Sequence, residues 1–471
     1  MSTRTASLSC VVTTGIYCRA GCPALPKREN VTRRRSSVAA EAAGFRPCLR
    51  CRPDRLAQTY FINGAPDPVQ RAILLIGEGA LDSSTEDVLG HRIGLSGRQL
   101  RRLFVEHVGA TPSFVARSRR AHFARRLLDE SDLSVTEIAF AAGFNSSRQL
   151  NRAMLDTFRF TPTDLRAKRR ESDRLVADGG LPLRTPYDGA FSFHQMLRFA
   201  ETRAVSGIEA VDASTYRRTI TTCGHPGVLE VSDAGYRKHL LVLAHLPTYN
   251  ALIDDIARVR RLFGLDLPAA DRLPALASDA LLGPLIAQRP GLRLAGGWDR
   301  FETAVRIIVS QQISLRGART ILGRMVEAFG SRVPGLGALG LTHTFPAAER
   351  LASVAEARIA DLGMPSARAA SIRSFARAYA SEQISLEPSA SLDSLVQQLE
   401  SLPGIGAWTA QCIAMRAAGH IDAFPAQDLG LRKSAARLLG RESISAAELD
   451  GLAEAWRPYR GLAAMHLWAA P

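Results

Sequence analysis

The 471-residue sequence predicts a multidomain, mainly helical protein, and its length is enough for three or four domains. Three observations support this prediction. Two close cysteine pairs near the N-terminus indicate a small α/β domain around a metal ion. Two similar helical stretches follow, about fifty residues apart. After a charged segment with glycine and proline, a mixed α/β stretch passes into a region whose pattern is helical almost throughout.

Positive charge is concentrated in the first third of the chain. The formal net charge is +15 at pH 7; residues 1–55 hold eleven Lys/Arg against three Asp/Glu, and residues 69–170 hold seventeen against eleven. An arginine-rich composition alone would not explain this concentration, which favours attraction to a polyanion. We recognise no signal peptide and no stretch of about twenty apolar residues, so we expect no membrane contact and a cytoplasmic, nucleoid-associated protein.

Four cysteines in this basic region form two pairs, Cys18-x3-Cys22 and Cys48-x2-Cys51. Four soft thiolates in two pairs with a loop between them suit a tetrahedral zinc ion. Disulfide bonds are less favoured, because nothing in the sequence indicates an oxidising compartment. The spacing alone leaves three possibilities: a structural zinc knuckle, a reactive zinc-thiolate centre, or cysteines that bind no metal.

The residues around these cysteines resemble the N-terminal domain of the bacterial Ada family. The resemblance covers roughly residues 11–55 and is carried by Thr13-Thr14-Gly15-Ile16-Tyr17-Cys18-Arg19, Arg28-Glu29-Asn30-Val31 and Ala43-Gly44-Phe45-Arg46-Pro47-Cys48-Leu49-Arg50-Cys51. It implies one Zn²⁺ held by all four cysteines, with Cys18 as the catalytic residue that takes a methyl group from a methylated DNA phosphate. Because methylation removes a negative charge from the four-thiolate site, the methylated protein should bind DNA more tightly and activate transcription.

Residues 69–170 predict helices with short polar breaks and contain an internal repeat. Leu100-Arg101-Arg102-Leu103-Phe104…Thr111-Pro112 is echoed by Leu150-Asn151-Arg152-Ala153-Met154…Thr161-Pro162, and each Thr-Pro suits the start of a helix. The pattern resembles the AraC-family tandem helix-turn-helix, which can place two helices in successive major grooves; a plain helical bundle is the alternative. The candidate DNA-contacting side chains are Arg98, Gln99, Arg101 and Arg102 on the first recognition helix and Ser147, Arg148, Asn151 and Arg152 on the second.

Glycines at alternate positions in Leu402-Pro403-Gly404-Ile405-Gly406 predict a tight hairpin between two helices. Backbone N–H groups around Leu402, Gly404 and Gly406 can approach a DNA phosphate there. This helix-hairpin-helix motif alone indicates sequence-independent DNA binding and leaves catalysis open. Asp428 follows the second helix, at a place where helix-hairpin-helix glycosylases carry a catalytic aspartate; a simple helix N-cap is the alternative.

From Tyr187 to Trp468 the chain resembles AlkA-type 3-methyladenine DNA glycosylase II, also through Arg289-Pro290-Gly291-Leu292-Arg293 and Ser310-Gln311-Gln312-Ile313-Ser314. The resemblance implies that the enzyme flips an alkylated purine out of DNA and hydrolyses its N-glycosidic bond, with Asp428 facing the sugar. It further implies a monofunctional enzyme, because Trp408 stands where glycosylase-lyases have a lysine. The expected base pocket comprises Trp408, Trp468 and Cys412, with Ile313 as the apolar wedge; for the two tryptophans a purely structural role is the alternative. His466 is expected to be a core histidine with satisfied hydrogen bonds.

We therefore expect a protein that both repairs alkylated DNA and regulates transcription. Its expected partners are double-stranded DNA, damaged and promoter, and RNA polymerase, and it should be a monomer. Without the Pro-Cys-His-Arg motif of a second methyltransferase, repair of O6-methylguanine is not predicted. The alternative is a transcription regulator whose glycosylase-like part only binds DNA. The expected segments are a zinc-binding methyl-acceptor domain (1–65), the helix-turn-helix domain (69–170), a linker (171–186), an α/β module (187–270) and an all-helical glycosylase domain (275–471).

Overall fold

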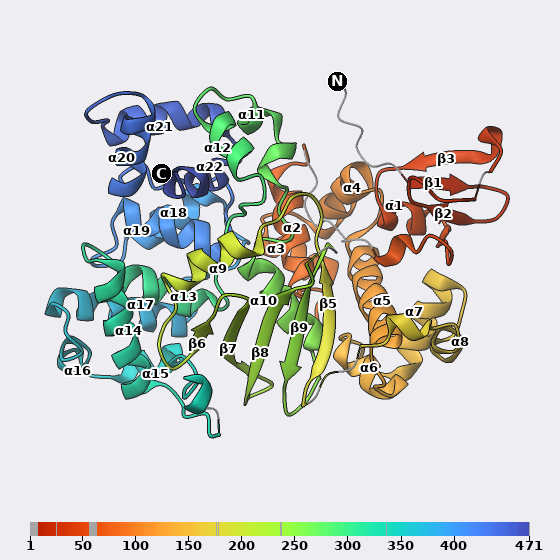
Figure 1. The fold of residues 1–471 in the computed structure, drawn as a ribbon, viewed down its shortest axis with the longest axis horizontal. Helices are drawn as coiled ribbons and strands as arrows, with labels where there is room; N and C mark the ends of the chain where they lie inside the picture. The colour runs from red at the N-terminus through yellow and green to blue at the C-terminus, as the bar shows by residue number, and fades with distance from the viewer. Residues whose placement is uncertain are drawn as a thin grey trace. The chain divides into compact units, whose positions relative to one another are not determined.

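The computed structural model describes residues 8–24, 26–55, 64–175, 177, 179–235, 238–335 and 337–470. The chain divides into two compact units (Figure 1). Unit 1 comprises Met1–Tyr187 and Lys238–Ala257, and unit 2 comprises Asp188–Arg237 and Arg258–Pro471. The expected segments 1–65 and 275–471 include residues 1–7, 25, 56–63, 336 and 471, which lie outside the described residues.

Unit 1 begins with a four-stranded sheet of order β3-β1-β2-β4. β1 (Leu8–Val11) pairs antiparallel with β2 (Ile16–Cys18) and β3 (Val31–Arg34), whereas β4 (Arg46–Pro47) pairs parallel with β2. Cys10 and Tyr17 lie opposite each other in the sheet, are fully buried, and pack with Ala40 of α1 (Ser37–Ala42). The small α/β domain predicted around the cysteines is therefore confirmed.

Helices α2 to α8 form a second part of unit 1, after the small sheet domain. Their bounds are α2 (Asp67–Gly77), α3 (Glu86–Arg92), α4 (Gly97–His107), α5 (Pro112–Glu130), α6 (Val135–Ala141), α7 (Ser147–Phe158) and α8 (Pro162–Ala167). The long helix α5 packs against α2, α4, α6, α7 and α8, so the pairs α3–α4 and α6–α7 share one central helix. Leu100, Phe104, Leu150 and Phe158 are fully buried, and Leu103 is half-buried and packs against the core that contains Leu100 and Phe104. This is the tandem helix-turn-helix that the internal repeat predicted.

The local sequence explains where these helices begin and how closely they approach. Thr111 and Thr161 cap α5 and α8 with their hydroxyls, and a proline occupies the first helical position of each. Glycine is required at two positions of the first pair: a Cβ at residue 97 would lie 2.0 Å from Asp87 Oδ1, and one at residue 90 would lie 2.8 Å from the Leu95 carbonyl oxygen. The glycines of α3 and α4 thus permit a close helix crossing.

The segment 171–186, expected to be a linker, contains regular structure. β5 (Leu181–Pro186) pairs antiparallel with β9 (His239–His245) within unit 1. Burial alternates along β5, with Leu181 and Leu183 buried, and such alternation is typical of a strand. The strand was not predicted because the glycine and proline content of this segment favoured a linker. In unit 2, β6 (Glu209–Val211), β7 (Thr215–Thr222) and β8 (His225–Asp233) form an antiparallel meander. Cys223 and Gly224, both with positive φ, make the two-residue turn between β7 and β8.

Unit 2 is otherwise helical. Its central helix, α13, has all but one residue buried and packs against α14, α17 and α19. α10 runs from unit 1 into unit 2. The helices are α9 (Phe193–Glu201), α10 (Leu252–Leu262), α11 (Pro274–Ala277), α12 (Leu282–Gln288), α13 (Arg300–Val309), α14 (Leu315–Phe329), α15 (Ala348–Ser353), α16 (Glu356–Ala360), α17 (Ser366–Ala380), α18 (Leu392–Glu400), α19 (Ala407–Ile413), α20 (Leu429–Leu438), α21 (Ala446–Ala453) and α22 (Arg460–Trp468). A π-helical turn (Ala414–Ala418) continues α19. Short 3-10 helices occur in both units: η1 (Arg28–Asn30), η2 (Pro53–Arg55) and η3 (Glu171–Asp173) in unit 1, and η4 (Ala270–Arg272), η5 (Gly337–Leu339) and η7 (Glu454–Trp456) in unit 2.

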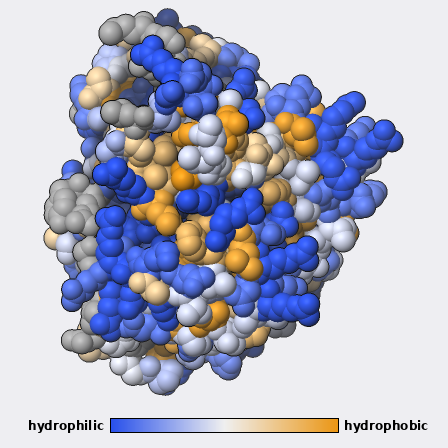
Figure 2. Space-filling view, turned by 90° about the vertical axis from the view of Figure 1, so that its right-hand side faces the viewer, coloured by the Kyte–Doolittle hydropathy of each residue, from blue (hydrophilic) through white to orange (hydrophobic). Residues whose placement is uncertain are grey.

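The exposed surface agrees with helices that bury one apolar side. On the face shown in Figure 2, hydrophilic residues predominate and apolar residues lie in patches between them. Within the described ranges, no helix combines the length and the apolar composition that crossing a membrane requires.

Candidate functional sites

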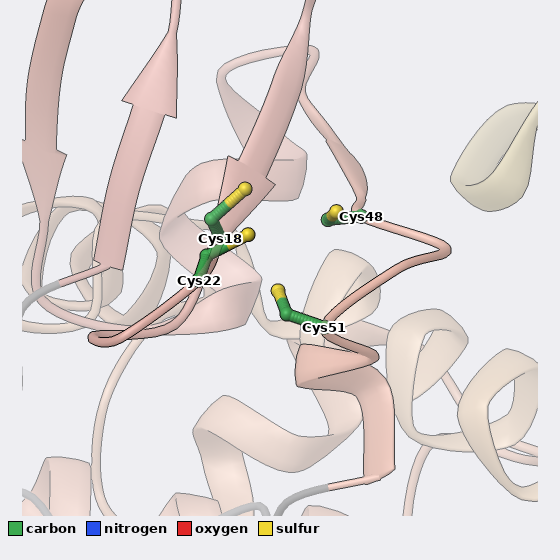
Figure 3. Close-up of side chains that lie close together, drawn as sticks. All are labelled: Cys18, Cys22, Cys48 and Cys51. Carbon is green, nitrogen blue, oxygen red and sulfur yellow. The ribbon is translucent and has the colours of Figure 1, made fainter. Parts of the chain in front are cut away.

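Four cysteine side chains come together in unit 1 (Figure 3). Cys18 ends β2 and Cys22 lies in the loop after it, whereas Cys48 and Cys51 lie between β4 and η2. Their sulfur atoms all lie within 4.8 Å of one another and face a common centre. Cys22 is partly exposed, and the other three are buried. The fold thus assembles the four side chains that the spacing predicted as one ligand set.

This donor set fits a zinc ion. Tetrahedral Zn²⁺ with Zn–S distances of about 2.3 Å places its sulfurs about 3.8 Å apart, so the four sulfurs need only small shifts. Burial raises the pKa of Cys51 to about 11, with the Cys22 and Cys48 sulfurs adding to the effect. Burial acts in the same direction on Cys48, but the N–H groups of Cys51 and Arg50 point at its sulfur and lower its pKa overall. Crowded sulfurs of this kind lose their protons together only when a cation balances their charge.

A buried polar cluster joins this domain to helix α5. The carboxylate of Glu41, on α1, accepts hydrogen bonds from Tyr17 Oη at 2.7 Å and Ser118 Oγ at 2.6 Å, and lies 2.6 Å from His122 Nε2. All four side chains are buried. Burial lowers the pKa of His122, but the facing Glu41 carboxylate outweighs it and the pKa is raised. One carboxylate therefore satisfies two groups on α5 and one on β2.

A second link begins at the residue next to Cys51. Arg52 adopts a φ of 47°, and its Nη2 lies 2.7 Å from Asp54 Oδ2 and 2.6 Å from Asp129 Oδ2. Asp129 belongs to α5 and also pairs with Arg125 at 2.6 Å. The loop that carries Cys51 is thus fixed to the central helix of the helix-turn-helix pairs.

The predicted DNA-contacting side chains lie on α4 and α7. Arg98, Gln99, Arg101, Arg102, Arg148, Asn151 and Arg152 are exposed, and Ser147 is half-buried. Some of them also serve the fold. The Arg101 guanidinium lies 2.7 Å from Glu86 and joins α4 to α3, and Gln99 completes the capping box with Ser96. Ser147 Oγ lies 3.3 Å from Thr136 on α6. Among the described residues, no such contact with a neighbouring helix is made by Arg98 and Arg102 on α4 or by Arg148, Asn151 and Arg152 on α7.

The predicted hairpin joins α18 to α19. Gly404 has a φ of 76°, and a Cβ there would lie 2.0 Å from Ser371 Oγ, so only glycine fits. Gly406 is the N-cap of α19 and supplies no side-chain cap, which leaves the first N–H groups of the helix for another acceptor. Leu402 is buried and anchors the turn. Gln311 braces the hairpin, donating from Nε2 to the Gly404 carbonyl oxygen at 2.9 Å and to Thr409 Oγ1 at 2.8 Å.

Unit 2 contains a cavity of about 300 Å³. Pockets for drug-sized ligands usually have volumes of roughly 300 to 1,000 Å³, so this cavity lies at the lower end of that range. The predicted pocket residues all line the cavity: Ile313, Trp408, Cys412, Asp428 and Trp468. Side chains from α9, α13, α14 and the sheet complete the lining. The fold therefore brings these five positions, which span more than 150 residues of sequence, to one hollow.

Asp428 is held by three N–H groups. Its Oδ1 accepts hydrogen bonds from the Leu431 backbone and from Trp468 Nε1, both at 2.9 Å, and its Oδ2 accepts one from Trp408 Nε1 at 2.9 Å. The side chain is thus the N-cap of α20 and lines the cavity at the same time. The N-cap role is therefore observed, and the three hydrogen bonds, which the charge of the carboxylate strengthens, fix the side chain in place.

Three further predicted positions have informative surroundings. Cys412 is buried and burial raises its pKa, so it is a neutral thiol in the cavity wall. Ile313 is half-buried and lines the cavity, whereas its neighbour Gln312 is exposed with a φ of 53°. His466 is buried as predicted, but the prediction of satisfied hydrogen bonds is wrong: neither ring nitrogen has a partner among the described residues. Burial lowers the pKa of His466 to about 4.

Three further residues of the cavity wall, Phe199, Arg203 and Arg416, were not predicted from the sequence. One signal for Arg416 was available, because Trp408, Cys412 and Arg416 recur every fourth residue and share a helix face. The π-helical turn from Ala414 to Ala418 also marks this stretch, since such turns are frequent at functional sites. Phe199 and Arg203 belong to the α/β part, where no motif pointed to a cavity.

Known families match most of the chain in four consecutive stretches. They are described as the metal binding domain of Ada (residues 4–54), a helix-turn-helix domain (89–168), the AlkA N-terminal domain (180–299) and the HhH-GPD superfamily of base excision DNA repair proteins (305–458).

Individual relatives match either nearly the whole chain or about three fifths of it. The chain is 38% identical to the probable bifunctional transcriptional activator/DNA repair enzyme AlkA of Mycobacterium tuberculosis, over 97% of this chain and 91% of that protein. It is 32% identical to DNA-3-methyladenine glycosylase 2 of Escherichia coli, over 60% of this chain and 94% of that protein. The 3-methyladenine DNA-glycosylase structure from Archaeoglobus fulgidus shares the fold, with a TM-score of 0.53 at 22% identity, over 61% of this chain and 96% of that one.

Proposed function

Because the chain belongs to the family of bifunctional transcriptional activator/DNA repair enzymes that includes AlkA of Mycobacterium tuberculosis, we propose that it excises alkylated purines of the 3-methyladenine type from DNA and activates transcription after accepting a methyl group. The observation that carries the enzymatic part is the carboxylate of Asp428, fixed by two indole N–H groups at the wall of a cavity behind a helix-hairpin-helix.

In the proposed reaction the extruded base occupies the cavity and water replaces it on the sugar. The C1′–N bond breaks with its electron pair going to the base, and a water oxygen bonds to C1′ while its proton is released. Positive charge develops on the sugar as the base leaves, and Asp428 stabilises that charge electrostatically. Three of its lone-pair positions already accept N–H groups, which favours this electrostatic role over proton abstraction from water.

The groups around the cavity support the proposal of a monofunctional glycosylase II. A glycosylase-lyase needs a primary amine that forms a Schiff base with the sugar. Trp408 occupies the corresponding hairpin position, and none of the described residues that line the cavity is a lysine. The product is then an abasic site, with the phosphodiester backbone intact.

The regulatory part depends on the four-cysteine site and on α4 and α7. A bound zinc ion would keep the cysteine sulfurs deprotonated and nucleophilic. The Cys18 sulfur then attacks the methyl carbon of a methyl phosphotriester; an S–C bond forms, the O–CH₃ bond breaks, and the phosphodiester leaves with the bonding electrons. Promoter DNA is contacted by the exposed side chains of α4 and α7, RNA polymerase is the partner in activation, and the protein acts as a monomer beside the cytoplasmic chromosome.

Base release tests the enzymatic part. Methylated duplex DNA is incubated with wild type or Asp428→Asn, and abasic sites are then cleaved with alkali. We expect the wild type to release methylated purines and the variant to release about 10²- to 10³-fold less per unit time. Equal release by the two proteins would leave the alternative, a regulator whose unit 2 only binds DNA.

Reduction with borohydride tests the monofunctional assignment. Borohydride should trap no covalent protein–DNA complex; a trapped complex would contradict the monofunctional assignment.

Peptide mass spectrometry tests the methyl acceptor. After exposure to DNA that carries methyl phosphotriesters, the added methyl group should lie on Cys18 and be absent from Cys18→Ala. A methyl group on Cys22, the more exposed of the four cysteines, would show that the acceptor is assigned to the wrong residue.

A further inference from the structure

The cavity of unit 2 is lined by more positive than negative side chains. Three carboxylates line it, and all three have partners. Glu209 and Glu302 bind Arg218 and Arg306 in a buried network, with Arg306 Nη2 lying 2.8 Å from Glu209 and 2.6 Å from Glu302. Asp428 is held by the two indoles and a backbone N–H. The arginines that remain are Arg203, Arg319 and Arg416.

Arg416 differs from the others because its guanidinium has no hydrogen-bond or ion-pair partner among the described residues. Its Nε is buried without an acceptor, and the group lies 5.1 Å from the centre of the Phe199 ring, on the cavity wall. It stands two helical turns beyond Trp408, on the face that also carries Cys412. Arg416 as a whole is half-buried, but its Nε–H is buried, and a buried donor is costly unless something accepts from it.

Arg203 strengthens the positive field at the same place. Its guanidinium stacks 3.7 Å from the centre of the Phe199 ring, and its donors are only partly used, by the Phe199 carbonyl oxygen and Thr202. Burial and the charge of Arg416 lower the pKa of Arg203 to about 9, and burial lowers that of Arg416 to about 10. Both groups remain charged at neutral pH.

Resting on the proposed glycosylase activity, we infer that Arg416 determines specificity by donating hydrogen bonds to an acceptor atom of a neutral damaged base and so assists its departure. The base leaves with the electron pair of the C1′–N bond. A cationic purine is neutralised by that pair and needs no help. A neutral purine becomes an anion, whose charge spreads to its carbonyl oxygen and ring nitrogens, where a guanidinium can stabilise it. Before release it takes a proton from water.

The inference assigns separate roles to two of the charged groups in the cavity wall, Asp428 and Arg416. Asp428 stabilises the sugar and should matter for every lesion. Arg416 should matter only where negative charge develops on the base. Aromatic stacking by Trp408 and Trp468 attracts cationic bases, and Arg416 extends the substrate class to neutral purines that carry an exocyclic oxygen.

The test uses the full-length protein and two duplexes that each carry one damaged base with the same exocyclic oxygen. One contains hypoxanthine, which is neutral, and the other contains 7-methylguanine, which is cationic. Single-turnover release is measured for wild type, Arg416→Met, Arg416→Lys and Asp428→Asn. Arg416→Met should lower hypoxanthine release roughly 10- to 100-fold, the range for one lost hydrogen bond from a charged donor, and leave 7-methylguanine release within about threefold. Arg416→Lys keeps the charge but loses the planar guanidinium, so its rate of hypoxanthine release should lie between those of wild type and Arg416→Met.

Each other outcome contradicts one of the two claims. If Arg416→Met and Arg416→Lys slow the release of both bases equally, or of neither, Arg416 does not distinguish neutral from cationic bases, and the reduced rates of Asp428→Asn would still support the glycosylase. If wild type releases neither base, the proposed glycosylase fails and this inference fails with it. Arg319→Met is the matched control: Arg319 lines the same cavity but is exposed and donates to the Ala204 carbonyl oxygen, so its loss should not change the ratio of the two rates.

Discussion

The two candidate centres stabilise negative charge in different ways. In unit 2, Asp428 receives all its partners from the chain, in the form of three N–H groups. In unit 1, the four cysteine sulfurs lie within 4.8 Å of one another, and only a few backbone N–H groups point at them. The cavity is therefore complete once unit 2 folds, whereas the cysteine site requires a cation. The difference teaches that one chain can contain a centre whose stability depends on metal and another whose stability does not.

The tryptophans allow the two units to be observed separately. The sequence has four, and Trp298, Trp408, Trp456 and Trp468 all belong to unit 2. Tryptophan fluorescence therefore reports the unfolding of unit 2 alone. Unit 1 can be followed by zinc content and promoter binding.

The largest expected effect is that of removing the metal. A strong chelator, or Cys51→Ser, should reduce the zinc content from one per chain to none and destabilise unit 1 by up to the order of 10 kcal/mol, because metal binding is folding free energy in small zinc domains. Promoter binding should be lost, while base release and the tryptophan unfolding transition stay unchanged. Loss of base release would show that the two centres are not independent.

A smaller effect is expected from Glu41→Gln. The variant keeps the size of the side chain but removes the charge that faces His122. Its amide also accepts hydrogen bonds from three donors less well than a carboxylate does. The free energy of unfolding of unit 1 should therefore fall by about 3 kcal/mol. The concentration of denaturant that releases zinc should fall. Glu29→Gln is the matched control, because Glu29 is exposed. Equal midpoints for the two variants would mean that the cluster does not stabilise the attachment to α5.

Mild acid should destabilise unit 2 through His466. Its pKa is lowered to about 4 by burial, below its ordinary value of 6.5, so the unfolded state binds a proton first as the pH falls. The stability that depends on the neutral ring is complete above pH 6.5 and decreases as the pH falls toward 4, by about 2 kcal/mol at pH 5. His466→Phe should remove this dependence from the tryptophan unfolding curve. An identical pH profile in the variant would exclude His466 as the cause.

The smallest expected effect concerns the indole donors. Trp408→Phe keeps an aromatic ring but loses the N–H that binds Asp428 Oδ2. Release of both cationic and neutral bases should fall about tenfold, since one hydrogen bond to a charged group contributes roughly 1.5 kcal/mol. Phe199→Leu serves as a comparison, because Phe199 lines the same cavity but is not among the three residues that donate hydrogen bonds to Asp428. A Trp408→Phe rate equal to wild type would show that Trp468 and Leu431 hold the carboxylate sufficiently.

How much the sequence predicts depends on whether the signal is local. The cysteine pairs, the Thr-Pro helix starts and the alternate glycines of the hairpin are short patterns, and the structure places each as predicted. The burial of Glu41 against His122 and Ser118 could not be predicted, because it joins residues 77 and 81 positions apart that belong to no motif. The same reason explains why Phe199 and Arg203 were missed. His466 was misjudged because periodicity predicts burial but not the partners of a buried ring.

The cluster around Glu41 also limits how the chain can be divided. A fragment with only the paired helix-turn-helix helices would lack the acceptor for Ser118 and the partner of His122, and would leave the α5 carboxylate of Asp129 without Arg52. These groups would then face water or collapse against apolar neighbours. The smallest fragment of unit 1 that can be expressed on its own should therefore retain the strands and the cysteine loops, because they complete the polar contacts of the central helix α5.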